Sequence, residues 1–265
     1  MRFDLKFAMR SARSGKGIDA LGSRHLPLDG RSKALCIALF VFLLLVFFQA
    51  ARMGVSGLIV EMAQREVDRW TATNSRRGLR DLNRVAGYFS DSLAITPDNP
   101  WALEALGGLD LARVRLARVP RDAVAYTRDA RARFRRALEQ RPTSPFLWAN
   151  VARSKLLLDE IDDEFLKALR TANELGPWEP ASQRSVLFSG LAAWGKLDAG
   201  LQRDLGAVIA RGGRHDVAKL YEIVKSYRRF DLVCGIQEYN SIAALDCRRT
   251  EVGAKSGQRA IKGNR

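Results

Sequence analysis

The stretch "ARARFRRALEQRP", Ala130–Pro142, carries the pattern on which the fold depends. Its small, large, small and proline residues stand at relative positions 0, 4, 7 and 12, as Ala130, Phe134, Ala137 and Pro142. Positions three and four residues apart share one face of an α-helix, and proline cannot continue a helix. The stretch therefore predicts a helix that buries an alanine–phenylalanine–alanine face and ends next to Pro142.

The same four positions recur on either side of this stretch. The upstream set is Val85, Phe89, Ser92 and Pro97, and the downstream set is Phe165, Leu169, Ala172 and Pro177. The sets resemble the second helix of a tetratricopeptide (TPR) repeat, and the middle set matches it in every residue type. The resemblance implies stacked helix pairs, in which small residues let two helices approach and the aromatic residue fills the space between pairs.

Segments suited to the first helix of each pair lie between these sets. "PWALEALGGLDLARVRL" contains Leu106-Gly107, and "PFLWANVARSKLLL" places Trp148 before Val151-Ala152, in the manner of the TPR signature W-x2-L-G. The three prolines are 45 and then 35 residues apart. This difference predicts an insertion of about ten residues near Val119–Tyr126, where Pro120 would break the helix.

Helical periodicity continues beyond Pro180, and strand signals are nearly absent. "PASQRSVLFSGLAAWGKL" is expected to form another first helix, with Trp194 on its apolar face. Two short helices are expected near Ala199–Ala210 and Asp216–Tyr227, with Gly212-Gly213 between them. The chain after its first 56 residues is therefore predicted to be an all-α, TPR-like α-solenoid, covering residues 57–247.

One apolar run, Ala34–Ala51, contains no charge over eighteen residues. A helix of this length spans roughly 27 Å at about 1.5 Å per residue, close to the hydrocarbon core of a bilayer. Apolar side chains occupy every face of a helix formed by this run, which predicts a single uncleaved transmembrane helix over residues 34–56. A cleaved signal peptide is the alternative, although its apolar core would be shorter and would end in small residues at positions −3 and −1.

Flanking charge predicts the orientation of this helix. Residues 1–33 hold eight basic and three acidic residues, whereas Arg52, Arg65 and Arg69 are the basic residues of 52–70. The more basic flank stays in the cytoplasm, so the helical domain would lie in a bacterial periplasm, anchored to the inner membrane. Residues 248–265, with six basic residues and one acid, are predicted to be a flexible tail. The formal charge of +15 for the whole chain favours an anionic neighbour.

The exported part contains two cysteines, Cys234 and Cys247, thirteen positions apart. A disulfide between them suits an oxidising compartment. Two buried free thiols are the structural alternative. The sequence favours the disulfide.

No residue pattern indicates an enzyme, a cofactor or a metal site. The P-loop, Rossmann, G-x-S-x-G and H-E-x-x-H motifs do not occur in the sequence. "LDEIDDEF", Leu158–Phe165, gathers five acids but lacks the ligand spacing and turn glycine of a calcium loop, and acids there stabilise the start of a helix. Asp216 is expected to cap a helix rather than to pair with His215, because adjacent residues do not face each other on a helix.

Candidate interaction residues are Trp178, Glu179, Arg131 and Arg135. "GPWEP", Gly176–Pro180, predicts a stiff turn in which Trp178 either fills the joint between repeats, the favoured reading, or offers a docking surface. Arg131 and Arg135 belong to an arginine-rich helix, most of whose charges are expected to be solvated. Some of them could hold an acidic polysaccharide or a lipid-linked phosphate. Trp70, Trp101 and Trp148 are expected in the core.

The order of several short motifs is similar to that of the VpsP-type proteins, which are TPR-like membrane proteins associated with bacterial exopolysaccharide biosynthesis. The matching segments are Arg69-Trp70, Pro97–Pro100, Arg141–Lys155 and Glu174–Pro180. The resemblance implies a pathway more than a reaction. It implies a non-catalytic adaptor for other polysaccharide assembly or export proteins. A direct binder of anionic polysaccharide or of a lipid-linked glycan is the alternative, and no nucleic-acid partner is expected.

Overall fold

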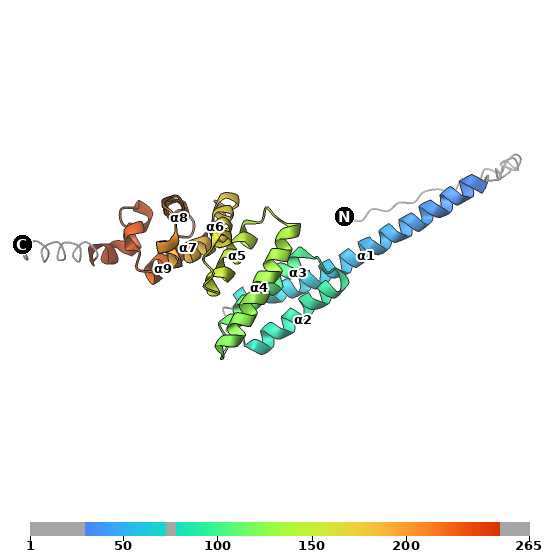
Figure 1. Cartoon of the computed structure of the whole chain (residues 1–265), viewed down its shortest axis with the longest axis horizontal. Coiled ribbons are helices and arrows are strands. Elements are labelled where there is room, and N and C mark those ends of the chain that lie inside the picture. The colour runs from blue at the N-terminus through green and yellow to red at the C-terminus, as the bar shows by residue number, and fades with distance from the viewer. Residues whose placement is uncertain (1–29, 73–77, 250–265) are drawn as a thin grey trace, which may run out of the picture. The chain divides into compact units, whose positions relative to one another are not determined.

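The computed structural model describes residues 30–72 and 78–249 of the chain. All regular structure in these two ranges is helical (Figure 1), which confirms the all-α prediction. Most of the predicted basic segment and all but two residues of the predicted tail lie outside the described residues.

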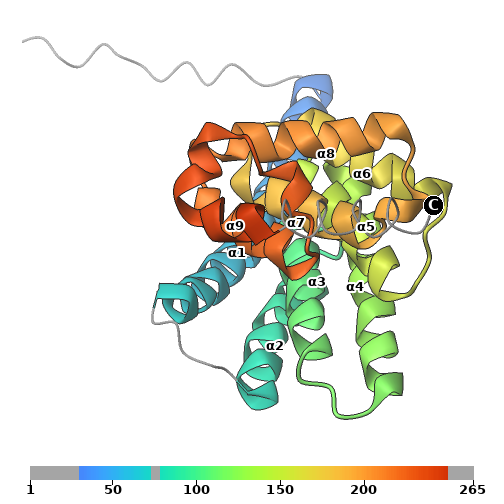
Figure 2. The same ribbon diagram turned by 90° about the vertical axis from the view of Figure 1, so that its left-hand side faces the viewer.

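The longer helices, in chain order, are α1 (Gly30–Ala72), α2 (Leu79–Ile95), α3 (Pro100–Val114), α4 (Pro120–Gln140), α5 (Pro145–Leu157), α6 (Asp163–Leu175), α7 (Pro180–Ala192), α8 (Ala199–Gly212) and α9 (Val217–Ser226). Three short 3₁₀ helices follow α7 or α9: Trp194–Lys196, Phe230–Leu232 and Gln237–Tyr239. A last helix covers residues 240–249. Figure 2 shows α2, α3 and α4 lying side by side, and each packs against the next.

The predicted repeat faces form the core of these helices. Each of the nine apolar or small residues in the three predicted sets has 0% of its surface exposed: Val85, Phe89 and Ser92 on α2, Ala130, Phe134 and Ala137 on α4, and Phe165, Leu169 and Ala172 on α6. The offsets 0, 4 and 7 thus identify one buried stripe on each second helix, as the periodicity predicts.

The proline of each set begins a short joint of one design. Each second helix ends at a cap residue, and a pair of prolines three positions apart follows. The first proline lies in the joint, and the second is the first residue of the next helix. The pairs are Pro97 and Pro100, Pro142 and Pro145, and Pro177 and Pro180. Proline suits the first helical position because the N–H that it lacks would have no partner there. Asn99 and Ser144 also cap α3 and α5 by accepting hydrogen bonds from backbone N–H groups.

The ten-residue insertion lengthens helices instead of interrupting one. α3 and α4 have 15 and 21 residues, where α5 and α6 have 13 each. The predicted break at Pro120 is wrong, because Pro120 occupies the first turn of α4, where proline is tolerated. Val119–Tyr126 is therefore the cap and first turns of α4.

Glycines permit the closest approach between helices of a pair. A Cβ atom added to Gly107 of α3 would lie 2.6 Å from Phe134 of α4, and one added to Gly190 of α7 would lie 2.5 Å from Leu205 of α8. Leu205 belongs to a fourth buried set on α8, with Leu201 and Val208 at the same offsets. Sequence inspection missed this set because Gly213 stands where the other sets have proline.

Helix α1 contributes to two compact units, residues up to Gln49 and residues from Ala50 onward. In the first unit apolar side chains such as Phe40, Leu45 and Phe47 are exposed. By its length and composition α1 is apolar enough to span a membrane. The helix extends well past the predicted end near residue 56, because residues 58–70 contain neither proline nor glycine to stop it.

In the second unit the C-terminal part of α1 packs on α2. Arg52 donates a hydrogen bond to the carbonyl oxygen of Ile95 at 2.5 Å. The hydroxyl oxygens of the buried Ser56 and Ser92 are 2.7 Å apart, and Ala63 joins the apolar core that α2 and α3 form. This part of α1 thus serves as the first helix of the pair that α2 completes.

Candidate binding groove

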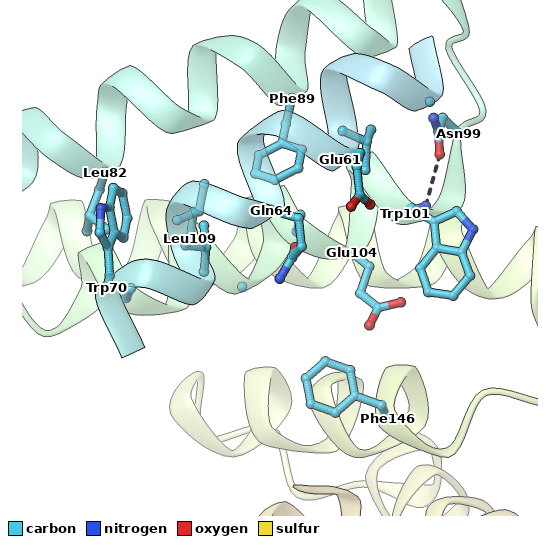
Figure 3. Close-up of a pocket in the computed structure, with 16 residues that line it drawn as sticks. Glu61, Gln64, Trp70, Leu82, Phe89, Asn99, Trp101, Glu104, Leu109 and Phe146 are labelled. Atoms are coloured by element: carbon cyan, nitrogen blue, oxygen red, sulfur yellow. Dashed lines mark hydrogen bonds between the residues drawn. The ribbon is translucent and has the colours of Figure 1, made fainter. Parts of the chain in front are cut away.

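Two adjoining cavities run along the first helices of the pairs, and together we call them the inner groove. The first, of about 840 Å³, lies among α1, α2, α3 and the start of α5, and Figure 3 shows its lining. The second, of about 460 Å³, lies among α3, α5, α7 and α9. Gly108, Ala112 and Phe146 line both cavities, which therefore adjoin at these residues.

The first cavity, here called the apolar cavity, has a hydrophobic end and a polar end. Trp70, Leu82 and Leu109 gather at one end in Figure 3, and Trp101 and Glu104 lie toward the other. Aromatic and aliphatic surface with a few polar groups is typical of ligand sites. The apolar cavity therefore suits a ligand with large apolar side chains.

Arg141 contacts two residues that line the apolar cavity, Trp101 and Glu104. Arg141 stacks on the indole of Trp101, with its guanidinium carbon 3.6 Å from the ring centroid, and donates to Glu104 at 2.6 Å. Burial raises the pKa of Glu104, although the charge of Arg141 acts in the opposite direction. The predicted burial of Trp101 is wrong, since 57% of it is exposed. Trp101 lines the groove, and the guanidinium of Arg141 stacks on its ring.

The second cavity, here called the basic cavity, is lined by three arginines: Arg115, Arg153 and Arg184. Arg184 forms an ion pair with Asp216 at the start of α9. Arg153 forms no ion pair, and its Nε atom is buried without a hydrogen-bond partner in the described chain. Burial lowers the pKa of Arg153, and the nearby positive charge of Arg115 lowers it further.

The arginines of α4 behave differently from those of the groove. Four of them form ion pairs with carboxylates of neighbouring segments: Arg131 with Glu160, Arg133 with Asp110, Arg135 with Glu164, and Arg136 with Asp98. None of the four lines either cavity. The candidates Arg131 and Arg135 therefore lie outside the groove, where their charges bind α4 to the start of α6.

The acidic cluster of Leu158–Phe165 surrounds a buried lysine. Lys155, 2% exposed, places its Nζ atom 3.3 Å from Glu160, 2.9 Å from Asp162 and 2.8 Å from Glu164. Asp162 also accepts a hydrogen bond from the Phe165 N–H and so caps α6. The described residues contain no group of three or more His, Cys, Asp or Glu side chains placed to hold a metal ion. Glu160, Asp162 and Glu164 have partners within the fold.

The other two candidate interaction residues, Trp178 and Glu179, lie in the joint before α7. Trp178 is 62% exposed, so the favoured burial in the joint is wrong. The joint is filled instead by Gly176, whose added Cβ would lie 2.6 Å from Pro145. Glu179 precedes α7 without capping it through its side chain. Trp178 and Glu179 line neither cavity and lie apart from Arg131 and Arg135 in the fold.

Asp216 lies at the predicted N-cap position, but it does not make the predicted capping hydrogen bond. Asp216 is the N-cap residue of α9, yet its side chain accepts no capping hydrogen bond. Its carboxylate pairs with Arg184 instead. The ion pair brings α7 and α9 together at the edge of the basic cavity.

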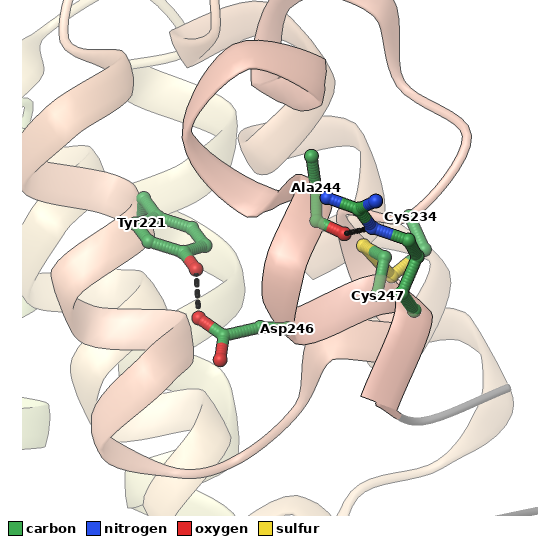
Figure 4. Close-up of a disulfide and its surroundings, with 6 residues drawn as sticks. Tyr221, Cys234, Ala244, Asp246 and Cys247 are labelled. Carbon is green, nitrogen blue, oxygen red and sulfur yellow. Dashed lines mark hydrogen bonds between the residues drawn. A yellow bond between two sulfur atoms is a disulfide. The ribbon is translucent and has the colours of Figure 1, made fainter. Parts of the chain in front are cut away.

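A disulfide closes the C-terminal end of the domain (Figure 4). Cys234 and Cys247 are bonded, with their Cα atoms 5.7 Å apart. Beside it the Tyr221 hydroxyl donates to Asp246, and the Tyr239 hydroxyl donates to the Ile209 carbonyl oxygen at 3.0 Å. Burial, with help from nearby carboxylates, raises the pKa of both tyrosines to about 12. The disulfide thus closes a loop within the segment after α9, and the two tyrosine hydrogen bonds hold that segment against α8 and α9.

Comparisons of the chain with protein-family models, with curated proteins and with solved structures find no match. The similarity to VpsP-type proteins accordingly stays a prediction. Sequence reasoning found the arginine-rich helix but missed Arg153, although Arg153 stands inside "PFLWANVARSKLLL". One signal was available, because Arg153 follows the buried Val151-Ala152 pair on a first helix, the kind of helix that faces the concave side of such a stack.

Proposed function

We propose that this chain is a membrane-anchored, non-catalytic adaptor whose inner groove holds a segment of a protein partner. The observation that carries the proposal is the continuity of the two cavities along α3, α5 and α7, through Gly108, Ala112 and Phe146. Stacked helix pairs expose such surfaces for extended or helical peptides. The apolar part of α1 supplies the anchor.

The compartment and the pathway are further parts of this proposal. The basic excess of residues 1–33 favours a cytoplasmic N-terminus and a periplasmic domain, and a disulfide in that domain suits an oxidising compartment. The order of motifs shared with VpsP-type proteins supports a role beside the exopolysaccharide assembly or export machinery of the inner membrane. The partner would then be another component of that machinery.

Site-specific photo-crosslinking of the full-length chain in cells tests the adaptor function. A photoreactive phenylalanine analogue replaces Phe146, which lines both cavities, or Arg128, which is exposed on α4 and lines neither. We expect position 146 to give a discrete adduct with one envelope protein, identified by mass spectrometry, and position 128 to give none. Equal crosslinking from both positions would contradict a groove-specific partner.

A direct binder of anionic polysaccharide or of a lipid-linked glycan is the second candidate function. The basic cavity, with the unpaired Arg153 beside Arg115, favours it. In the same crosslinking experiment this function would give a glycan or lipid adduct at position 146 in place of a protein adduct.

A further inference from the structure

The guanidinium of Arg153 is exceptional among the partly buried arginines of the described chain. Every other half-buried arginine in residues 31–70 and 78–249 has an oxygen partner, as in Arg52 with Ile95, Arg141 with Glu104 and Arg211 with Asn173. Arg153 has only the face of Phe188, whose ring centroid is 5.5 Å from its guanidinium carbon. A desolvated cation without a counter-charge costs free energy, so Arg153 in this position lowers the stability of the fold.

A second buried donor lies in the same cavity. Ser185 of α7 is 9% exposed, and its hydroxyl has no hydrogen-bond partner within the described residues. Buried hydroxyls normally have a partner, which makes each exception informative. Arg153 and Ser185 come from neighbouring first helices, α5 and α7, and both line the basic cavity.

The charges around Arg153 leave a net positive site. Arg115, at the end of α3, lines the same cavity and forms no ion pair within the described residues. Arg184 is neutralised by Asp216. The site thus offers two uncompensated guanidinium groups, one of them partly buried, together with a hydroxyl that has no partner within the described residues and the amide of Asn150.

From this geometry we infer that the basic cavity is an anion-binding site, and that it takes a carboxylate of an acidic protein segment whose apolar side chains occupy the apolar cavity. The inference rests on the proposed adaptor function and names the chemistry of its partner. Arginine binds carboxylates through paired N–H groups, and the guanidinium of Arg153 has no carboxylate partner within the described residues. A serine hydroxyl completes the hydrogen bonding of the second carboxylate oxygen.

Continuity with the apolar cavity favours a peptide over a polysaccharide. A ligand that crosses Gly108 and Phe146 must be apolar on one side and anionic on the other, and a polysaccharide chain has no large aliphatic or aromatic side chains. A lipid-linked phosphate also combines both properties. However, Glu61, Gln64 and Glu104 line the apolar cavity, and these groups can accept or donate hydrogen bonds to a peptide backbone but would be desolvated by a hydrocarbon chain.

Fluorescence anisotropy with the full-length chain in detergent micelles tests the inference. The probe is a short fluorescein-labelled peptide with a leucine-rich half followed by a glutamate-rich half. The comparison peptide carries glutamine in place of every glutamate. Sodium alginate and farnesyl pyrophosphate serve as competitors that represent a uronic polysaccharide and a lipid phosphate.

Three variants report on the site. Arg153→Gln removes the buried charge, Ser185→Ala removes the free hydroxyl, and Arg136→Gln removes one equal charge from α4 as the matched control. We expect Arg153→Gln to weaken binding of the glutamate peptide about tenfold or more, since truncating one partner of a buried charge pair raises the off-rate strongly. Ser185→Ala should weaken it about threefold, and Arg136→Gln should leave it within about twofold at moderate salt.

Several results would overturn the inference. These are no measurable binding of the glutamate peptide, equal binding of the glutamine peptide, or an equal loss with Arg136→Gln. The inference would also be overturned if the chain bound alginate or farnesyl pyrophosphate in preference to the peptide and this binding required Arg153. The ligand would then be a glycan or a lipid. If a groove-specific protein adduct forms at position 146 while Arg153→Gln leaves peptide binding unchanged, the carboxylate site fails and the adaptor function stands.

Discussion

The arginines of α4 and the arginines of the inner groove show two uses of one residue type. Arg131, Arg133, Arg135 and Arg136 each pair with a carboxylate of another segment, so their charges are already neutralised by the fold. Arg153 is more enclosed than Arg135 or Arg136, yet it has no carboxylate. The difference teaches that arginine density along the chain does not identify a binding surface, and we take the unmatched, partly buried charge of Arg153 as the better guide to one.

The same contrast extends from charge to packing. The stripes of α4, α6 and α8 lie on a filled side, with glycines where side chains meet, and the side along the first helices is hollow. Substitutions on the filled side should therefore lower stability and spare binding, and substitutions along the hollow side should do the reverse.

The largest expected effect is that of Phe134→Ala on the filled side. Phe134 is fully buried between α3 and α4, and truncation of a core phenylalanine costs about 3–5 kcal/mol. Urea unfolding followed by circular dichroism of the full-length chain in micelles measures the loss. The matched control is Phe146→Ala, which should cost about 1 kcal/mol or less because Phe146 is partly exposed in the groove. Equal losses for the two variants would remove the distinction between the sides.

Lys155→Met should have the next largest effect, a loss of about 2 kcal/mol in the free energy of unfolding. The buried ammonium holds three carboxylates, and removing one partner of a buried ion pair costs about 3–5 kcal/mol. The carboxylates are partly exposed, so we expect less than that range. The same urea titration measures this change, and a variant as stable as the native chain would show that the cluster is not structural.

Acid pH offers an independent check on this cluster. Hydrogen bonds from Lys155 and from the Phe165 N–H lower the pKa of Asp162, and hydrogen bonds from Arg135 and Lys155 lower that of Glu164 against the effect of burial. Groups with a lowered pKa in the fold add stability at neutral pH, and this is lost as the pH falls below about 4.5 through their folded pKa values. Lys155→Met should flatten this acid limb of the stability profile.

Adjacent glycines on α3 allow a sharper comparison. Gly107→Ala should destabilise by about 1–3 kcal/mol, because its Cβ would lie 2.6 Å from Phe134. Gly108→Ala should stabilise by about 0.5–1 kcal/mol, because nothing lies within 4 Å of its Cβ position and alanine is the better helix former. Thermal unfolding monitored by circular dichroism separates the two. Effects of the same sign would show that α3 is not placed against α4 as described.

The smallest expected effects concern the stability of charge variants without ligand. Arg136→Gln should lose about 0.5 kcal/mol, since its ion pair with Asp98 is exposed. Arg153→Gln should lose nothing or gain slightly, because no intramolecular partner is broken and a desolvated charge is removed. Thermal midpoints in the same buffer compare them. A larger loss for Arg153→Gln would mark Arg153 as structural.

Much of the fold could be read from the sequence because it depends on local spacing. The three small–large–small sets predicted nine fully buried positions, since helical periodicity fixes which residues share a face. The buried set on α8 was not predicted, because Gly213 stands where the other sets have proline. Pro120 was expected to break a helix but begins one, because proline is found both after the end of helices and in their first turn.

The site could be predicted only in part, because it depends on contacts between distant residues. Whether Arg131 or Arg153 is free is decided by carboxylates elsewhere in the chain, such as Glu160 and Asp216. Trp101 and Trp178 were expected inside, but tryptophan content does not show which way a side chain that follows a proline of the joint points. The spacing of Cys234 and Cys247 allowed a disulfide and left free thiols open, and the position of the last helix joins the two residues.

The most direct test of the central claim, that the inner groove is where this protein acts, is a Gly108→Leu substitution in the full-length chain. Gly108 lies where the two cavities meet, and no atom surrounds its Cβ position within 4 Å, so leucine should fill the groove without disturbing the core. We predict an unchanged or raised thermal midpoint together with loss of the protein adduct at position 146. A folded variant that still gives the same adduct at the same yield would contradict the account.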